Sequence, residues 1–532
     1  MRNFFRFTYL VLVCALASLH ASAASTASLP TTPAGVANAS ACAALMQHDF
    51  SALPEAPTTI LSAKFTASAD GKPGYCDVEG YVNPNVGFGM RLPADNWNGK
   101  YLVHGCGGSC GTVAIAFSCA GLTEQGYACI QTDMGHKSRI SDGVWAYNNT
   151  PAMIDFGYRA THVSTLAGRA VSQAFYAKPI KRSYYLGCST GGRQGLVEAQ
   201  RYPFDFDGIA VNAPVTKQSG AAMQLLWSAQ VNIDQHGKQI LTAAKLPALA
   251  AAVVAACDMN DGVKDGLVGD PRQCHFDPAS MICKAADNNS CLTTAQAHVV
   301  KEIYAGPHTS DGKALYTGGA PRGSETQWLH AYVLDGTEGP NKLAADNFRY
   351  MLFDPAPGPS WKASEFNWDE DYKRVGTRDS LYGAFNPDLR QYKEHGGKLL
   401  MMQGWSDINV VPLNAVDYYE TATRTMGGPA QTMDFFRLFM VPGAEHCTGG
   451  DGAWAVDTLS ALDAWVETGK APEVLIGTKA KPGSVSGGYL QVAMPNVTMT
   501  PAFQRPYYPY PTRTVYDGHG DPASASSFKP AP

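Results

Sequence analysis

The sequence predicts an α/β protein whose sheet is mostly parallel and whose helices cover both faces. Short apolar runs alternate with amphipathic stretches over residues 99–211, and the same alternation resumes over residues 398–466. Strands that alternate with helices favour parallel pairing, because each helix carries the chain back to the start of the next strand. The hydrophobic content is 45% over 532 residues, which is enough for a large core.

The first block of alternation begins with two strands around a glycine-rich segment and continues as a long helix. Apolar residues recur at helical spacing after Asp155, and this pattern ends near Pro179. The predicted elements are, in order, a strand over 99–104, a strand over 127–132, a helix over 155–177, a strand over 183–187, a helix over 191–201 and a strand over 208–211.

The second block repeats this pattern closer to the C-terminus. Its predicted elements are a strand over 398–402, a helix over 413–425, a strand over 434–440 and a helix over 455–466. The tail from Pro501 is rich in Pro and Tyr, and Pro removes a donor that a strand needs. We therefore expect the tail to lie extended on the surface rather than to form an element.

The segment between the two blocks has a different composition, with four cysteines, four tryptophans and many Gly, Asp and Asn residues. A structureless loop of this length is implausible, so the segment is expected to be an inserted domain. The predicted organisation is a signal peptide over 1–23, the first part of the sheet domain over 24–214, the insert over 215–390 and the second part of the sheet domain over 391–532.

The N-terminus and the cysteines indicate an oxidising compartment. Arg2 precedes an apolar run over 9–19, and Ala21-Ser22-Ala23 supplies the small residues of a cleavage site. The alternative is a membrane anchor, but the run is shorter than a bilayer requires. Cleavage removes Cys14 and leaves an even number of the 13 cysteines. We expect a secreted or periplasmic protein without a membrane span.

The charge of the chain argues against nucleic acid as a partner. Lys and Arg number 41 against 46 Asp and Glu, which gives a net charge of -5. No basic block is present that would follow a phosphate backbone. The sequence leaves the oligomeric state open.

The sequence Gly187-x-Ser189-x-Gly191 stands between a predicted strand and a predicted helix, the context in which such a match indicates a nucleophile. A sharp strand-to-helix turn needs residues without a Cβ on either side of the serine. The following helix directs backbone N–H groups at the site, where they stabilise a developing oxyanion. The alternative interpretation is a glycine-rich packing turn.

A serine nucleophile needs a base and an orienting acid. In α/β-hydrolases the chain order is serine, acid, histidine, and each partner follows a late strand. Asp407 follows the first of the two late strands, and His446 follows the second. The alternatives are a turn aspartate and a surface histidine, and Asp417 and Glu445 compete as acids but follow the strand ends less closely. The predicted fold class is an α/β-hydrolase fold with a large inserted domain between the nucleophile and the acid.

Two cysteines lie beside these residues. Cys188 immediately precedes the serine, and Cys447 immediately follows the histidine. A hydrogen bond between Ser189 and His446 would bring the two cysteines close together. A Cys188–Cys447 disulfide would then join the nucleophile turn to the histidine loop.

This arrangement resembles the tannase and feruloyl esterase family, whose members carry Cys-Ser, Asp and His-Cys motifs and which also includes mono-hydroxyethyl terephthalate hydrolases. The matching phrases are Gly105-Cys106-Gly107-Gly108, Gly187-Cys188-Ser189-Thr190-Gly191-Gly192-Arg193-Gln194-Gly195, Arg201-Tyr202-Pro203-x-Asp205-Phe206-Asp207-Gly208-Ile209, Gly404-Trp405-Ser406-Asp407 and His446-Cys447. The resemblance implies that Ser189 is the nucleophile, His446 the base and Asp407 its acid. It also implies an oxyanion hole from the N–H of Thr190 and one N–H of the glycine-rich segment, for which we choose Gly107.

A second cluster of polar residues lies in the insert, where aspartates alternate with glycines over residues 257–267. Such spacing surrounds a hard cation with oxygens, although the terminal Glu of an EF-hand is missing. The family resemblance places a structural Ca²⁺ here. The implied ligands are the carboxylates of Asp258, Asp261 and Asp265 and the carbonyls of Val263 and Leu267. The alternative is a solvated turn without metal.

Three further cysteine pairs are expected. Cys257–Cys274 would fix the ends of the aspartate-rich loop, Cys283–Cys291 would close a short loop in the insert, and Cys42–Cys76 would fasten the mature N-terminus. The four remaining cysteines, Cys106, Cys110, Cys119 and Cys129, allow three pairings among which the sequence does not choose. A zinc site is disfavoured because they form no CxxC pair.

The resemblance implies an esterase that acts on aromatic acyl groups. Its insert would be an aromatic-rich lid that stacks on a flat acyl group, and Arg349 and Phe353 stand at helical spacing to contact it. The expected substrates are small esters derived from plant cell walls or tannins, with feruloyl esters first, and galloyl or mono-hydroxyethyl terephthalate esters as alternatives. A non-catalytic Ca²⁺-stabilised binding protein and a serine peptidase are the competing classes.

Overall fold

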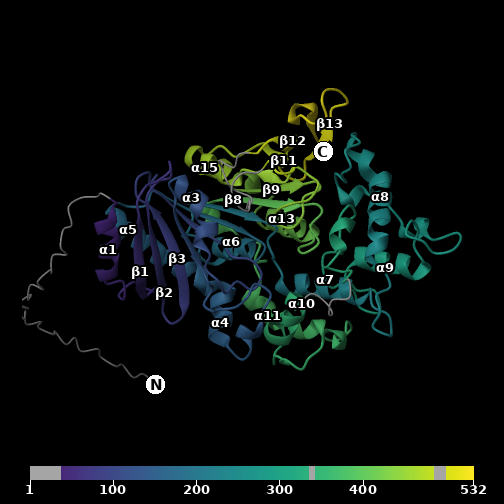
Figure 1. The fold of residues 1–532 in the computed structure, drawn as a ribbon, viewed down its shortest axis with the longest axis horizontal. Coiled ribbons are helices and arrows are strands. Elements are labelled where there is room, and N and C mark those ends of the chain that lie inside the picture. Colours follow the sequence, from purple (N-terminus) through teal and green to yellow (C-terminus); the bar gives the residue numbers. More distant parts are fainter. Residues whose placement is uncertain (1–36, 335–341, 485–498) are drawn as a thin grey trace, which may run out of the picture. The chain divides into compact units, whose positions relative to one another are not determined.

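A sheet of nine strands forms the centre of the protein in the computed structural model (Figure 1), which describes residues 37–334, 342–484 and 499–532. The predicted signal peptide lies outside the described residues. The strands, in their order across the sheet, are β1 (Thr58–Thr66), β2 (Tyr75–Val82), β3 (Val86–Pro93), β5 (Ala128–Thr132), β4 (Lys100–His104), β6 (Arg182–Cys188), β7 (Gly208–Asn212), β8 (Lys398–Gly404) and β9 (Phe436–Val441). The strands from β5 to β9 pair in parallel, whereas β1, β2, β3 and β5 pair antiparallel.

Helices cover both faces of this sheet. Successive residues of a strand point to opposite faces, so Tyr185 packs with α5 (Ala160–Tyr176) and α6 (Thr190–Arg201), whereas Tyr184 packs with α3 (Ala120–Glu124) and α15 (Thr458–Thr468). Helix α13 (Leu413–Thr425) lies on the same face as α5 and α6. The predicted α/β architecture with a mostly parallel sheet is confirmed.

The predicted elements of both blocks are present, with end shifts of a few residues. The long helix begins five residues before the predicted start, as α4 (Thr150–Ile154). It continues through a π-helical segment, η3 (Asp155–Arg159), into α5, and it ends where Ala177 adopts a positive φ of 49°. Three strands at the antiparallel edge, β1 to β3, are additional. Their alternation of buried and exposed positions is interrupted by a bulge in β1 between Ile60 and Ser62.

The expectation of a tail without elements is wrong. Residues of the tail form β12 (Pro501–Tyr507), which pairs with β11 (Leu475–Ala480), and the hairpin of β13 (Arg513–Tyr516) and β14 (Phe528–Ala531). Strand β12 is the edge of a three-stranded sheet whose other edge is β10 (Ala455–Val456). An edge strand tolerates Pro, because its outer side needs no donor.

The chain between β7 and β8 contributes no strand to the large sheet among its described residues. Its main helices are α7 (Gln218–Gln230), α8 (Leu246–Cys257), α9 (Thr294–Ala305), α10 (Lys342–Asp346), which continues as η9 (Asn347–Leu352), α11 (Tyr372–Tyr382) and α12 (Arg390–Glu394). Figure 1 shows α8 and α9 farther from the sheet than α7 and α10. The chain from Val36 to Pro532 forms one compact unit.

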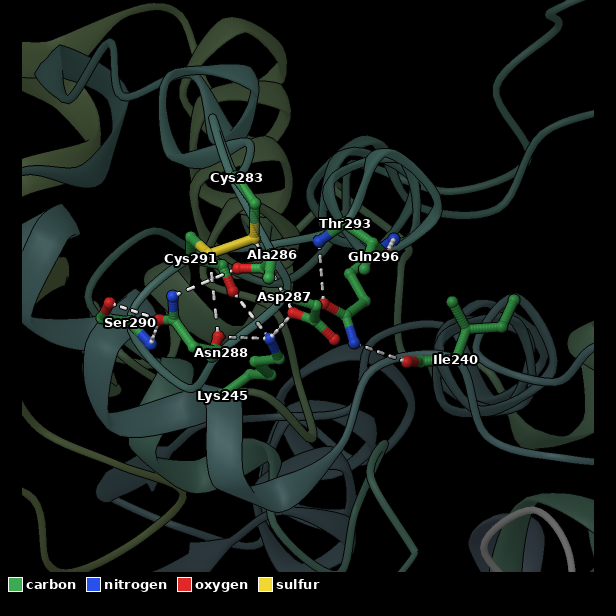
Figure 2. Close-up of polar contacts among 10 residues, drawn as sticks. All are labelled: Ile240, Lys245, Cys283, Ala286, Asp287, Asn288, Ser290, Cys291, Thr293 and Gln296. Atoms are coloured by element: carbon green, nitrogen blue, oxygen red, sulfur yellow. Dashed lines mark hydrogen bonds and ion pairs between the residues drawn. A yellow bond between two sulfur atoms is a disulfide. The ribbon is translucent and has the colours of Figure 1, made fainter.

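A buried lysine fastens a disulfide loop between α8 and α9 (Figure 2). Lys245 donates from Nζ to the carbonyls of Asn288 at 2.6 Å and Cys291 at 2.8 Å, and to the carboxylate of Asp287. The next helix begins with a capping box, in which the Thr293 and Gln296 side chains each accept the backbone N–H of the other residue. The three N–H donors of the Lys245 ammonium are thus all satisfied by the loop, which has little regular structure.

One described stretch, Ala243–Asp261, is long and apolar enough by composition to cross a membrane, with 19 residues at a mean hydropathy of 1.2. It comprises α8 and the short helical turns on either side. Leu246, Leu249 and Val253 of α8 are buried in the hydrophobic core. Since 39% of the apolar window is buried, this pattern is typical of a helix that packs one face against a core.

Candidate active site

Ser189 stands on a sharp turn between β6 and α6. Its backbone adopts φ 62° and ψ -121°, a region that residues other than glycine rarely occupy. Gly187 has no room for a side chain, because a Cβ there would lie 2.5 Å from the carbonyl of Gly191, and a Cβ on Gly191 would lie 3.1 Å from the carbonyl oxygen of Cys106. The strained turn holds the serine at the carboxyl end of the sheet, where the sequence predicts a nucleophile.

His446 and Asp407 lie in the loops that follow β9 and β8. The Nδ1 atom of His446 is 2.8 Å from Oδ2 of Asp407. The Asp407 carboxylate is fully buried and accepts three more hydrogen bonds, from the backbone N–H groups of Asn409 and Val410 and from the side-chain amide of Gln403. These donors stabilise a buried carboxylate and fix its orientation toward the imidazole.

A disulfide joins the serine turn to the histidine loop. Cys188 and Cys447 are bonded, with a Cα–Cα distance of 5.8 Å. Asn212, at the end of the neighbouring strand β7, donates from Nδ2 to the carbonyl of Cys447 at 2.9 Å. The disulfide therefore connects residues that are 259 positions apart in the chain. It lies where Ser189 and His446 line the same cavity.

A cavity of about 460 Å³ lies at this edge of the sheet. Ser189 and His446 line it together with Thr190 and Gly107, the two residues predicted to donate to an oxyanion. Among the described residues that line the cavity there is no Asp, Glu, Lys or Arg, and apolar side chains form most of its wall. The cavity thus favours a neutral, largely apolar ligand.

The glycine-rich segment that carries Gly107 is held by α6. Gln194 accepts the backbone N–H of Cys106 at 3.3 Å and the hydroxyl of Tyr185 at 2.9 Å. A second disulfide, Cys106–Cys110, closes the segment. Gly107 lines the cavity, and among the described residues no hydrogen bond donated by its backbone N–H is present. Sequence reasoning did not assign Gln194 a role, although it lies in one of the matched phrases.

The two side chains predicted to contact a ligand in the lid lie elsewhere. Phe353 is fully buried among aromatic rings, which include Phe348 and Phe366. Arg349 donates to the carboxylate of Asp346 and to the carbonyl of Trp361. Neither Arg349 nor Phe353 is among the described residues that line the cavity.

One face of α7 and one face of α10 and η9 line the cavity instead. The α7 residues are Gln218, Ala221, Ala222 and Leu225, and the facing residues are Leu343, Ala344, Asn347 and Met351. Sequence reasoning missed them. The spacing of three and four residues after Pro214 is a signal for one helical face, but it does not show what that face contacts.

The aspartate-rich segment follows α8 as a tight loop. Asp258 accepts the backbone N–H groups of Asp265 and Gly266 at 3.0 Å each, and Asp265 pairs with Arg505 of β12 at 2.7 Å. Burial, together with the charges of Asp265 and Asp258, raises the pKa of Asp261 to about 7. Carboxylates in one loop are the ligand type that a hard cation prefers. The ligand atoms of Asp258, Asp261 and Asp265 do not all lie within 4.8 Å of one another in the structure, so a cation in this loop stays a prediction.

Six disulfides are present in the described residues. The pairs expected from the sequence, Cys42–Cys76, Cys188–Cys447, Cys257–Cys274 and Cys283–Cys291, are all formed. The four cysteines whose pairing the sequence left open form Cys106–Cys110 and Cys119–Cys129. This number of disulfides indicates an oxidising, extracytoplasmic compartment.

The fold and the cavity define an α/β-hydrolase. More narrowly, the chain belongs to the tannase and feruloyl esterase family, which it matches over residues 71–531, and it is a carboxylic ester hydrolase. It is 32% identical to an uncharacterised esterase of Xanthomonas campestris pv. campestris, with 90% of each chain covered. It is 31% identical to the mono(2-hydroxyethyl) terephthalate hydrolase of Piscinibacter sakaiensis, with 88% of this chain and 86% of that protein covered.

A solved structure supports the same fold and the same family. The crystal structure of feruloyl esterase B from Aspergillus oryzae superposes with a TM-score of 0.79 at 26% identity. The match covers 89% of this chain and 97% of that one. The predicted fold class and the predicted family are therefore confirmed.

Proposed function

We propose that the protein hydrolyses esters of aromatic acids, with feruloyl-type esters as the preferred substrates. The observation that carries this proposal is that Ser189 and His446 line one cavity whose described wall is mostly apolar and bears no acidic or basic chain other than the histidine. A flat aromatic acyl group gives up few hydrogen bonds with water when it enters such a cavity, and it gains favourable contacts with apolar side chains. Family membership supports the same reaction class.

In the proposed mechanism Ser189 is the nucleophile. His446 takes the serine proton on Nε2, because its Nδ1 faces Asp407, and it later gives that proton to the leaving alcohol. Asp407 holds the imidazole orientation and stabilises the imidazolium. The N–H groups of Thr190 and Gly107 bind the oxyanion of the tetrahedral intermediate. Water then hydrolyses the acyl-enzyme, which releases the acid.

The candidate substrates can be ranked by the charge of their acyl groups. A terephthalate half-ester carries a free carboxylate on the ring opposite the ester that is cleaved, and burying this charge without a cation is costly. Arg349 already bonds Asp346 and does not line the cavity in the described chain. We therefore place feruloyl esters first, galloyl esters second and mono(2-hydroxyethyl) terephthalate last, although a hydrolase of the last compound is among the relatives.

The experiment is a hydrolysis panel of methyl ferulate, methyl gallate and mono(2-hydroxyethyl) terephthalate with the wild type and Ser189→Ala. We expect the highest kcat/KM for methyl ferulate and a loss of about a millionfold in kcat on Ser189→Ala. A fluorophosphonate probe should label the wild type and not the variant. The matched control is Ser172→Ala on α5, whose hydroxyl is buried away from the cavity and bonds Gly168.

Three results would contradict the proposal. Retained hydrolysis in Ser189→Ala would remove the serine from the mechanism. Absence of labelling and turnover in the wild type would favour a non-catalytic binding protein. Faster cleavage of aryl anilides than of the matching esters would favour a peptidase.

We further infer that the aspartate-rich loop holds a structural Ca²⁺. The residues that would bind it are Asp258, Asp261 and Asp265 through carboxylates, and Val263 and Leu267 through carbonyls. Support comes from the clustering of three carboxylates in one loop and from the raised pKa of Asp261. The ion would supply positive charge that stabilises the loop, and no step of the reaction requires it.

The cellular location is inferred from the disulfides and from the N-terminal sequence. We infer export from the cytoplasm, either to the periplasm or to the medium, through the predicted signal peptide. The six disulfides support an oxidising destination. Small esters released from plant material fit this location.

A further inference from the structure

The glycine-rich segment beside the nucleophile packs against the loop that follows β5, residues 133–140. The backbone N–H of Ser138 in this loop donates to the carbonyl of Gly111 at 3.2 Å. The two chains approach each other closely, because a Cβ on Gly108 would lie 2.4 Å from the carbonyl oxygen of Ile140. The position of the glycine-rich segment therefore depends on this loop.

Ser109 lies at the centre of the contact between the segment and the loop. It lines the cavity and is only 2% exposed. Its backbone N–H donates to the carbonyl of Ile140 at 2.8 Å, and Nε2 of His136 lies 2.7 Å from its carbonyl oxygen. The loop thus holds both polar groups of the Ser109 backbone, and it holds the carbonyl through a side chain.

The ring of His136 has a fixed orientation. It is only 5% exposed, and it stacks on the indole of Trp145 with 3.7 Å between the ring centroids and 12° between the planes. The turn that leads to it contains positive φ values at Met134 and Gly135. A buried and stacked ring does not turn freely, so Nε2 stays directed at Ser109.

The surroundings of the ring assign its proton to Nε2. The Nδ1 atom of His136 lies 3.2 Å from the carbonyl oxygen of Met134, so both ring nitrogens face acceptors. Burial lowers the pKa of His136, which favours a neutral ring with a single N–H. With this proton on Nδ1, the lone pair of Nε2 would face the Ser109 oxygen at 2.7 Å and repel it. The N–H therefore belongs on Nε2 and donates to Ser109.

His136 acts from outside the cavity. It is not among the described residues that line the cavity, whereas Gly107, Gly108 and Ser109 are. The glycine-rich segment is held on its other side by α6, because Oγ1 of Thr190 donates to the carbonyl of Gly108 at 2.8 Å. A loss of support on the loop side would therefore let the segment shift relative to the nucleophile.

We propose that His136 is a positioning residue for the oxyanion hole, because its Nε2–H holds the carbonyl of Ser109 and so keeps the N–H of Gly107 where the oxyanion forms. This assignment rests on the proposed mechanism, in which Gly107 donates to the oxyanion. It extends the mechanism to a loop that the reaction does not otherwise use. A displaced donor stabilises the transition state less, which lowers kcat while substrate binding stays the same.

The test compares His136→Phe with His136→Gln. Phenylalanine keeps a ring that stacks on Trp145 and removes the donor. We expect kcat for methyl ferulate to fall by about tenfold to a hundredfold, while KM stays within about twofold of the wild type. Glutamine places an amide N–H near the position of Nε2, so His136→Gln should recover kcat to within about threefold of the wild type.

Inhibition by phenylboronic acid provides a second measurement. The Ser189 oxygen bonds to boron and its proton passes to His446, so the adduct is tetrahedral and carries an oxygen in the oxyanion position. Its Ki should rise in His136→Phe by about the factor by which kcat falls. A smaller fraction of folded protein would lower the measured rate and leave Ki unchanged, so Ki separates positioning from stability.

A matched control is available in the insert. Nδ1 of His308 lies 2.9 Å from the carbonyl oxygen of Gly306, and His308 is not among the described residues that line the cavity. His308→Phe should keep the kcat and Ki of the wild type, even where it lowers Tm. Equal losses in His308→Phe and His136→Phe would attribute the effect to general destabilisation and would overturn the assignment.

The remaining outcomes separate this inference from the proposed function. Wild-type kcat or an unchanged Ki in His136→Phe overturns the role of His136, and the esterase function stands as long as Ser189→Ala is inactive. Equal losses in His136→Gln and His136→Phe show that ring packing matters rather than the donor, which also overturns the role. A wild type that hydrolyses none of the esters overturns the proposed function and this role with it. Where His136→Phe does not fold, His136→Asn replaces it, because the shorter amide does not reach Ser109 and the same loss of kcat is expected.

Discussion

At the scale of single residues, two buried carboxylates, those of Asp407 and Glu325, are satisfied in different ways. Asp407 accepts four hydrogen bonds and faces an imidazole. Glu325, in the insert, accepts the hydroxyl of Tyr304 at 2.7 Å and the backbone N–H of Gly323, and it is only 1% exposed. Burial raises the pKa of Glu325 to about 7.

Glu325 should make stability depend on pH. From about pH 4.5 to about pH 7 an unfolded Glu325 is ionised while the folded residue keeps its proton, so stability falls as the pH rises through this window. The loss amounts to about 3 kcal/mol and is complete above the folded pKa. Glu325→Gln cannot ionise and should remove this component. Urea unfolding of both proteins at several pH values measures the difference.

The control for this prediction is an exposed glutamate. Glu370→Gln alters a side chain that is 66% exposed and pairs with Lys373, so its unfolding curve should follow the wild type at every pH. Parallel pH profiles for Glu325→Gln and the wild type would show that Glu325 is ionised in the folded protein.

At the scale of elements, the aspartate-rich loop after α8 determines how the insert and the C-terminal strands meet. Arg505 of β12 pairs with Asp265, and its guanidinium also lies over the rings of Phe503 and Phe528. The loop thus contacts the region that sequence reasoning left without elements. A cation in the loop would reinforce this contact by offsetting the carboxylate charge.

Removal of Ca²⁺ should therefore lower the stability of the folded protein. We expect EGTA to lower Tm by roughly 2–5 °C and added Ca²⁺ to restore it, because a ligand that binds only the folded state stabilises it. In Asp261→Asn the response to EGTA should disappear. Thermal unfolding monitored by circular dichroism measures both effects.

Asp287→Asn is the matched control for the metal prediction. Asp287 pairs with Lys245 in the neighbouring disulfide loop and is not a proposed ligand. Its loss should lower Tm and leave the response to EGTA in place. A wild type whose Tm is the same in EGTA and in Ca²⁺ would argue for a solvated turn without metal.

At the scale of the whole molecule, one disulfide spans the insert. Cys188–Cys447 joins residues 259 positions apart, whereas Cys283–Cys291 closes a separation of 8. In the chain-entropy description the longer closure restricts the unfolded chain more, by about 5 kcal/mol against about 2–3 kcal/mol. The longer disulfide also fixes the distance between the serine turn and the histidine loop.

Replacing both cysteines of each pair by serine separates these roles. The Cys188/Cys447 variant should lose more stability in urea than the Cys283/Cys291 variant, and it should also lose kcat/KM at temperatures where it remains folded. The Cys283/Cys291 variant should keep the kcat/KM of the wild type. Equal activity in the two variants would show that packing alone positions the serine and the histidine.

The sequence was most informative where local chemistry decides the conformation. Helix α13 covers the residues that its periodicity predicts, and the turn at Ser189 follows from glycines that the close approach of α6 to β6 requires. The sequence was least informative at the edges of the sheets. Strand β1 is interrupted by a bulge and β12 contains Pro, so pairing with neighbours rather than intrinsic preference makes these two segments strands. Strand β2, in contrast, alternates regularly between buried and more exposed positions, a pattern that predicts a strand.

The sequence by itself thus determined the class of fold, the family and the residues around Ser189, Asp407 and His446, because these depend on short motifs and on chain order. Only the tertiary structure decided which side chains line the cavity. The cavity wall combines α7, η9 and the glycine-rich segment, which lie far apart in the chain. Packing brings them together, and it buried Phe353 among rings. No local pattern encodes such contacts, because they depend on the relative placement of whole elements.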